Sequence, residues 1–253
     1  MPVLRHAAAV AARDYGPDSL ELAYTLNELG VAGKYAGSFD EAAVAYARSV
    51  RIVERSLGAD HPRLADLYHN LGGLEHARGR FASGERYARR GLAIRVRTIG
   101  SDPLPIAADE AALAALLEGQ GRFEEAQRLY EHTLVIFERA GAPARYDVAI
   151  TSNNLAAVYQ RTNRLDEAEP LYLRALSIKE SLLGSGHPDV AMTMNNLAVL
   201  YKREKRYAEA AALYGRALTI FENALGKEHP KVAICHANYA RLLRLMEHNK
   251  EKQ

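Results

Sequence analysis

The chain has 253 residues, 48% of them hydrophobic and 25% charged, so its composition is that of a folded protein rather than a disordered one. Its 33 basic and 31 acidic residues are too evenly balanced to attract nucleic acid, and its single cysteine, Cys235, excludes an internal disulfide and a cysteine-based zinc site. No stretch approaches the ~20 apolar residues of a membrane span, and the first residues lack a signal peptide, so we expect a cytoplasmic protein without membrane contact.

The main organising feature is a repeat of 42 residues. Alanine recurs at this spacing, and a leucine, or once a tyrosine, follows six residues later. The alanines are Ala23, Ala65, Ala107, Ala149, Ala191 and Ala233, and the residues that follow them are Leu29, Leu71, Leu113, Leu155, Leu197 and Tyr239. A fixed period of this length indicates a stacked repeat architecture.

Each period predicts two amphipathic helices. In the second helix of the fourth period, Ala168, Tyr172 and Ala175 share one face at spacings of four and three residues. The turn between the two helices carries Gly37, Gly79, Gly121, Asn163 or Lys205. Glycine and asparagine tolerate the left-handed conformation that ends a helix, so Lys205 is the exception in this series.

Successive periods are joined by short linkers. These carry Gly58, Gly100, Gly184 and Gly226, with Ala142 at the equivalent place in the third, and His-Pro pairs at 61–62, 187–188 and 229–230. Proline suits the first position of a helix. The third linker departs from this sequence pattern, and we expect a locally different loop there rather than a domain boundary.

We therefore expect one repeat domain over residues 1–253. Its parts are an N-terminal half-repeat helix (4–17), five repeats (18–59, 60–101, 102–143, 144–185 and 186–227), a C-terminal half-repeat helix (228–247) and a tail (248–253). The two half-repeats are either the terminal caps that a solenoid needs or the ends of a piece of a longer array, and the apolar face of the last helix favours the second.

The pattern resembles the tetratricopeptide repeat. The segment HPDVAMTMNNLAVLYKREKRYAEAAALYGRALTI (187–220) is similar to the 42-residue variant in the repeat domain of kinesin light chains and in many bacterial proteins. The resemblance covers nearly the whole chain and implies an all-α, right-handed superhelical solenoid of antiparallel helix pairs. It is specific for the fold but not for the function, and no heptad segment indicates a motor subunit.

In such a solenoid the first helix of each pair lines the concave face. Asparagine recurs there four and five residues after the repeat alanine, and in similar repeat domains the one at the fifth position holds the backbone of an extended peptide. The candidate peptide-binding asparagines are Asn70, Asn153, Asn154, Asn195, Asn196 and Asn238, with Glu28 and Ala112 interrupting the series at the fifth position. The alternative is that these amides bond to the preceding helix or to their own backbone and only fix the repeat geometry.

The same face becomes basic toward the C-terminus. Its candidate binding residues there are Arg161, Lys202, Arg203, Arg241 and Arg244. As a set they favour an acidic peptide, although each alone is more typical of a solvated residue that satisfies carbonyls at a helix end. The N-terminal part of the face carries Asp66, His69 and His76 instead, and a metal site there is not expected because nothing in the sequence fixes the imidazoles.

No catalytic motif occurs, and Cys235 and His236 are adjacent on a helix and so point about 100° apart. We expect Cys235 to be a packing residue, and we expect neither cofactor nor metal. The sequence predicts a non-catalytic scaffold that binds a protein or peptide partner in its groove. The alternative is a self-association or regulatory module, possibly a fragment of a longer protein, monomeric or weakly associating through its terminal helices.

Overall fold

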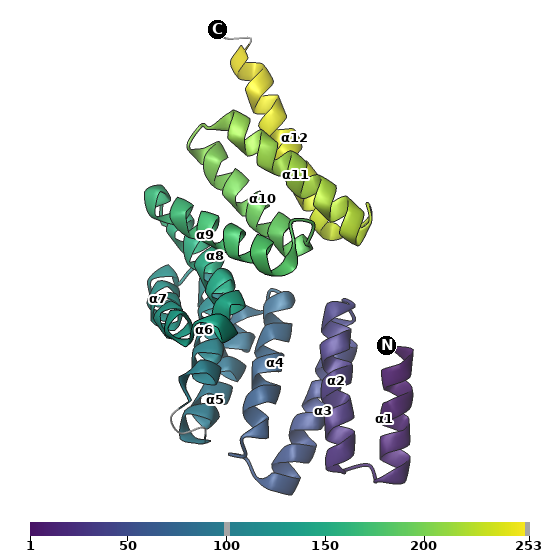
Figure 1. The fold of residues 1–253 in the computed structure, drawn as a ribbon. Coiled ribbons are helices and arrows are strands. Elements are labelled where there is room, and N and C mark those ends of the chain that lie inside the picture. The colour runs from purple at the N-terminus through teal and green to yellow at the C-terminus, as the bar shows by residue number, and fades with distance from the viewer. Residues whose placement is uncertain (99–101, 251–253) are drawn as a thin grey trace. The chain divides into compact units, whose positions relative to one another are not determined.

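A computed structural model describes residues 1–98 and 102–250, the side chain of Lys250 excepted (Figure 1). Helices make up almost all of the described ranges, which contain no strand. They are α1 (Pro2–Asp14), α2 (Leu20–Tyr35), α3 (Phe39–Leu57), α4 (Arg63–Ala77), α5 (Phe81–Thr98), α6 (Pro103–Gly119), α7 (Phe123–Ala140), the 3-10 helix η1 (Ala142–Ala144), α8 (Arg145–Arg161), α9 (Leu165–Leu183), α10 (Pro188–Arg203), α11 (Tyr207–Leu225) and α12 (Pro230–Lys250). The expected all-α class is confirmed.

The helices group into two compact units, Met1–Ile136 and Phe137–Gln253, and the division falls inside α7. In the N-terminal unit the first helices form one layer in which α4 contacts both α2 and α6, while α3 and α5 pack beside them (Figure 1). In the C-terminal unit α8, α10 and α12 form the corresponding layer, with α9 and α11 beside them. The expected single domain and its repeat boundaries stay a prediction.

The core of four of the five repeats holds a tyrosine packed against small residues, whereas the second repeat has Ala88 at this position. Tyr46, Tyr172 and Tyr214 are fully buried, and so are Ala168 and Ala175 on the face that the sequence predicts. Gly30 lies against the ring of Tyr46, where an added Cβ would come within 2.6 Å of the ring. Small residues on one helix therefore admit the large side chain of the next.

The turn inside each repeat has a left-handed residue at the expected position. Gly37 has a φ of 74°, and Asn163 and Lys205 have φ values of 64° and 63°. Lys205, the exception in the sequence, adopts the same conformation as its equivalents, because the backbone bond from Arg206 N–H to the Tyr201 carbonyl (2.9 Å) closes the same helix end.

The linker histidines begin the next helices. The Nδ1 atoms of His61, His187 and His229 accept hydrogen bonds from the backbone N–H two residues later, at 3.3, 3.1 and 3.1 Å. Each thereby satisfies a donor that a helix start leaves open.

The third linker differs, as expected. Gly141, with a φ of 70°, takes the left-handed conformation there, and Ala142, which the sequence places at the linker-glycine position, instead begins the 3-10 helix η1. Gly100 lies outside the described residues.

One inward-facing position, buried at Val53 and Lys179 and half-buried at Arg95, differs in chemistry from repeat to repeat. Val53 is apolar, but its equivalents 42 and 126 residues later are Arg95 and Lys179. Arg95 bonds to Asp109 (2.5 Å) and Asp66 (2.9 Å), whereas the ammonium of Lys179 donates to the hydroxyl of Thr193 (3.0 Å). Lys179 therefore carries its charge against a neutral partner in the core.

The last helix, α12, continues to Lys250, three residues beyond the expected end at 247. Its inner side is packed, since Cys235 and Leu242 are buried. Ala233, the equivalent of the fully buried Ala191, is exposed, and so is Leu243. The face that a second helix covers in each full repeat is thus uncovered here.

Candidate functional site

The candidate site of the C-terminal unit is a row of asparagines on the first helices α8, α10 and α12. Asn196 on α10 donates from Nδ2 to Oδ1 of Asn153 on α8 (3.2 Å), and Asn238 on α12 donates in the same way to Asn195 on α10 (3.3 Å). Asn153 also donates to Oδ1 of Asn154 (3.1 Å). The five candidate asparagines of this unit thus form two hydrogen-bonded groups, Asn154–Asn153–Asn196 and Asn195–Asn238, and we call the two together the asparagine row of α8, α10 and α12.

The N-terminal unit repeats this bond once. Asn70 on α4 donates from Nδ2 to Oδ1 of Asn27 on α2 (3.0 Å). Asn27 is the residue that the sequence interpretation left out of the candidate set, although its place in the repeat, four residues after the alanine, is that of Asn153 and Asn195. The recurrence of asparagine at both positions was the signal that could have identified it.

A small pocket opens beside Asn27 in the N-terminal unit. Its volume is about 130 Å³. It lies between α2, α3 and α4 and is lined by Leu20, Ala23, Tyr24, Asn27, Ser49, Val53, Arg63, Asp66 and Leu67. The guanidinium of Arg63 lies over the ring of Tyr24, 4.2 Å from its centroid. A mostly apolar pocket with an amide at its edge suits one small side chain of a bound segment.

The basic residues of the C-terminal unit divide by their contacts. Arg203 donates to the main-chain carbonyl of Gln160 and to Oδ1 of Asn163 (2.9 Å), so its guanidinium holds the end of α8. Arg241 and Arg244 are exposed on α12, and within the described residues their side chains make no ion pair. Burial and the nearby Arg241 lower the pKa of Lys202. Arg161 is the last residue of α8.

The polar residues of the N-terminal face are tied to the helices behind them. His69 Nδ1 lies 2.7 Å from Oδ1 of Asp109, a buried residue of α6, and Arg95 bridges Asp109 to Asp66. Burial, with a smaller contribution from Lys34, lowers the pKa of His76. Within the ranges that the structure describes, no three His, Cys, Asp or Glu side chains gather as a metal site would require.

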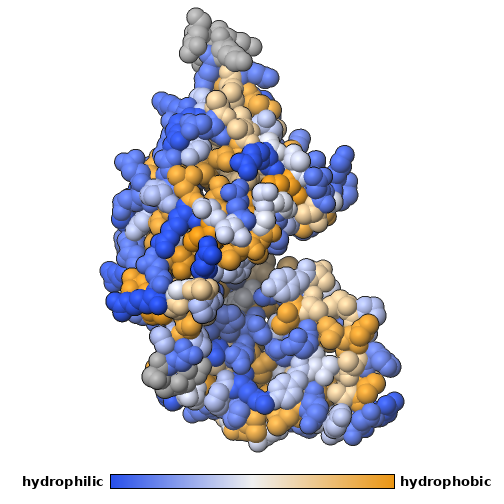
Figure 2. Space-filling view, viewed as in Figure 1, coloured by the Kyte–Doolittle hydropathy of each residue, from blue (hydrophilic) through white to orange (hydrophobic). Residues whose placement is uncertain are grey.

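Cys235 is buried, and its thiol donates to the carbonyl of Tyr214 (3.8 Å). Burial raises the pKa of this thiol to about 11, which disfavours the thiolate at neutral pH, and the buried position agrees with the expected packing role. None of the described helices has the length and apolar character that crossing a membrane requires. Figure 2 shows hydrophobic areas between hydrophilic ones on both units, so neither visible face is uniformly polar.

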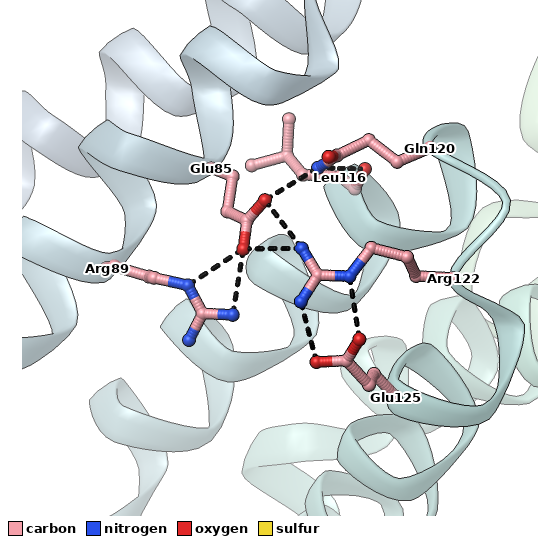
Figure 3. A network of polar contacts seen from close by, with 6 residues as sticks. All are labelled: Glu85, Arg89, Leu116, Gln120, Arg122 and Glu125. Carbon is pink, nitrogen blue, oxygen red and sulfur yellow. Dashed lines mark hydrogen bonds and ion pairs between the residues drawn. The ribbon is translucent and has the colours of Figure 1, made fainter.

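A charged network behind the first helices fixes neighbouring repeats of the N-terminal unit (Figure 3). Glu85 on α5 accepts from Arg122 (2.9 Å), Arg89 (2.8 Å) and Gln120 (2.8 Å). Arg122 in turn holds Glu125 with two bonds of 2.6 and 2.7 Å. In the C-terminal unit Arg206 makes the equivalent bonds to Glu169 (2.9 Å) and Glu209 (2.7 Å).

The family model of the tetratricopeptide repeat matches the chain over residues 34–95, 106–181, 147–223 and 189–251. A comparison with curated proteins gave no match.

Several solved structures share the fold. BtubC (BKLC) from P. vanneervenii is 25% identical with a TM-score of 0.62, over 87% of this chain and 83% of that one. A putative kinesin light chain from Podosopora anserina with nearly identical TPR-like repeats is 23% identical with a TM-score of 0.60, over 80% and 96%. The Rap conjugation gene regulator of the plasmid pLS20, in complex with the Phr* peptide, is 13% identical with a TM-score of 0.72, over 91% and 64%. These similarities confirm the solenoid of helix pairs that the sequence predicts.

Proposed function

The chain belongs to the tetratricopeptide repeat family, and on that premise we propose that it is a non-catalytic scaffold that binds a peptide segment of a partner protein along its first helices. The observation that carries this proposal is the asparagine row. A solved relative of the same fold, the Rap regulator, is in complex with a peptide, which supports a peptide as the kind of ligand.

The row suits an extended peptide because each bond between asparagines uses only part of an amide. Asn196 donates one Nδ2 hydrogen to Asn153, and within the described residues its Oδ1 accepts no hydrogen bond. The same holds for Asn238 and its bond to Asn195. The remaining donor and acceptor of each amide match the carbonyl and N–H of a peptide unit, and the bond to the neighbouring helix holds the amide in place before the ligand arrives.

The charge of the C-terminal unit favours an acidic segment. Lys202, Arg241 and Arg244 extend the asparagine row on α10 and α12, and the described residues supply no carboxylate to pair with them. A carboxylate of the ligand would relieve their mutual repulsion and accept charge-assisted bonds. Arg203 contributes less to this preference, because its guanidinium is bonded to the end of α8.

The test is a titration of short fluorescent peptides, acidic and neutral, against the wild-type chain and a variant with Asn154→Ala and Asn196→Ala. We expect the acidic peptide to bind the wild type and the double variant to bind about tenfold more weakly, the equivalent of one lost net hydrogen bond or slightly more. Asn223→Ala, an exposed asparagine on α11, is the matched control and leaves binding unchanged. Binding equal in all three proteins contradicts the assignment, provided that circular dichroism shows the same helicity.

A second candidate function, self-association, is favoured by the exposed face of α12 around Ala233 and Leu243. Sedimentation of the wild type and of Leu243→Glu at increasing concentration tests it. An increase of mass with concentration in the wild type, absent in the variant, supports it, and a concentration-independent monomer excludes it.

A further inference from the structure

A second pocket of the N-terminal unit lies between the second helices α3 and α5 and over α4. Its volume is about 520 Å³, within the roughly 300–1,000 Å³ of small-ligand sites. Four arginines line it: Arg51, Arg78, Arg80 and Arg86. Its buried floor includes Val50, Tyr68 and Leu71, and the ring of Tyr68 stacks with that of Tyr87 at 6.2 Å.

Among the residues that the structure describes, carboxylates pair with only one of these four arginines. Arg78 bonds to Asp40 (2.6 Å) and Glu75 (3.2 Å). Within the described residues the guanidinium groups of Arg51, Arg80 and Arg86 have no hydrogen bond and no ion pair, while Glu54, the other carboxylate of the pocket, accepts from the hydroxyl of Tyr68 (2.8 Å). The pocket thus holds three unpaired positive charges.

Comparison with the other repeats explains why Arg80 is unpaired. Arg80 occupies the same place in its repeat as Arg122, Arg164 and Arg206. Each of those three bonds to a glutamate three residues later, with shortest distances of 2.6, 2.6 and 2.7 Å. Arg122 and Arg206 also bond to Glu85 and Glu169 of the preceding repeat, both at 2.9 Å (Figure 3).

At Arg80 both acidic partners are missing. The residue three positions later is Ser83, and the equivalent of Glu85 in the preceding repeat is Ala43. Both small residues line the pocket. The space that two glutamates fill elsewhere is therefore open here, beside an arginine that keeps its charge.

We propose that this pocket, which we call the Arg80 pocket, binds an acidic side chain of a partner protein segment, with an adjacent aromatic or aliphatic residue packed on Tyr68 and Tyr87. The carboxylate takes the place that Glu85 and Glu125 occupy around Arg122, and Arg86 and Arg51 supply further charge-assisted bonds. This is a second binding surface, built from other residues than the asparagine row of α8, α10 and α12, and it does not depend on that row binding a peptide.

The decisive variant restores the missing acids. Ala43→Glu with Ser83→Glu rebuilds around Arg80 the arrangement of Figure 3, so it should fill the pocket without loss of thermal stability. The probe is a fluorescent Glu-Glu-Phe-Glu-Glu peptide, compared with its Gln-Gln-Phe-Gln-Gln counterpart. Both are titrated in the Asn154→Ala, Asn196→Ala background, so that the asparagine row contributes as little as possible.

We expect the acidic peptide, and not the neutral one, to bind in that background, and the two added glutamates to weaken binding at least about tenfold. Arg80→Gln with Arg86→Gln gives the same loss and keeps the test valid if the glutamate variant does not fold. Arg128→Gln, which removes one exposed arginine 42 residues after Arg86, is the control outside the pocket and changes affinity less than about twofold. Absence of binding in the asparagine background, or binding that neither pocket variant changes, overturns the proposal.

Discussion

Asn196 and Asn153, 43 residues apart in the chain, are joined side chain to side chain by a hydrogen bond of 3.2 Å. The same bond joins Asn238 to Asn195, and Asn70 to Asn27 in the other unit. Part of the alternative reading of these residues is thus observed, because their amides do bond to the preceding first helix. The bond still leaves half of each amide available, so a structural role and a binding role are compatible.

Removal of one asparagine should therefore cost stability as well as binding. Asn153→Ala and Asn196→Ala should each lower the free energy of unfolding by about 1 kcal/mol, the net value of one hydrogen bond, and the double variant by less than the sum. Urea unfolding of the four proteins of this cycle measures the coupling. A coupling energy of zero would show that the two amides do not interact in solution.

The buried charge of Lys179 should destabilise the fold. Its ammonium is buried and donates to Thr193, and burial lowers its pKa. Because the folded state disfavours the protonated lysine, the free energy of unfolding should rise as the pH increases from the folded pKa toward the unfolded value of about 10.4. Lys179→Met should raise stability by roughly 1–3 kcal/mol at neutral pH and remove this increase.

Urea unfolding between pH 7 and 10 measures both effects. Lys227→Met, which removes an exposed lysine, is the control and should change neither. A Lys179→Met variant less stable than the wild type at neutral pH would contradict the expectation.

Two buried tyrosines at the same place in their repeats should respond differently to loss of the hydroxyl. The hydroxyl of Tyr172 donates to Oε1 of Gln160 (2.9 Å), whereas that of Tyr214 has no hydrogen-bond partner in the described part of the chain. Tyr172→Phe should lower the free energy of unfolding by about 1 kcal/mol, and Tyr214→Phe should leave it unchanged or raise it. Thermal unfolding of the two variants gives the comparison, and equal losses would refute it.

Replacement of Lys205 by glycine should stabilise the fold. Its φ of 63° costs an ordinary residue roughly 1–2 kcal/mol, a cost that glycine avoids, although glycine also loses more chain entropy on folding. Lys205→Gly should therefore stabilise the chain by up to about 1 kcal/mol in urea unfolding. Asn163→Gly, at the same place one repeat earlier, should gain less, because asparagine tolerates this conformation, and a larger gain there would count against the explanation.

The fold was largely predictable from the sequence because the 42-residue period repeats both the core residues and the turns. Lys205 was not, because the hydrogen bonds that end a helix override the preference of a single residue. The bond between Asn196 and Asn153 was not predictable either, because it joins two helices, and residue spacing within one helix does not determine contacts with another. The Arg80 pocket results from the absence of glutamate at positions 43 and 83. The sequence repeat shows this absence, but only the structure shows that Arg122 binds both equivalent glutamates, so the consequence for Arg80 could not be predicted.

The central claim is that the asparagine row holds a peptide, and the most direct test is the NMR spectrum of its side-chain amides. We expect titration with an acidic peptide to shift the Nδ2 signals of Asn154, Asn196 and Asn238, with that of Asn223 unchanged, since these groups would exchange solvent for peptide bonds. Shifts confined to residues of α9 and α11, or binding without any change at these three amides, would contradict the account.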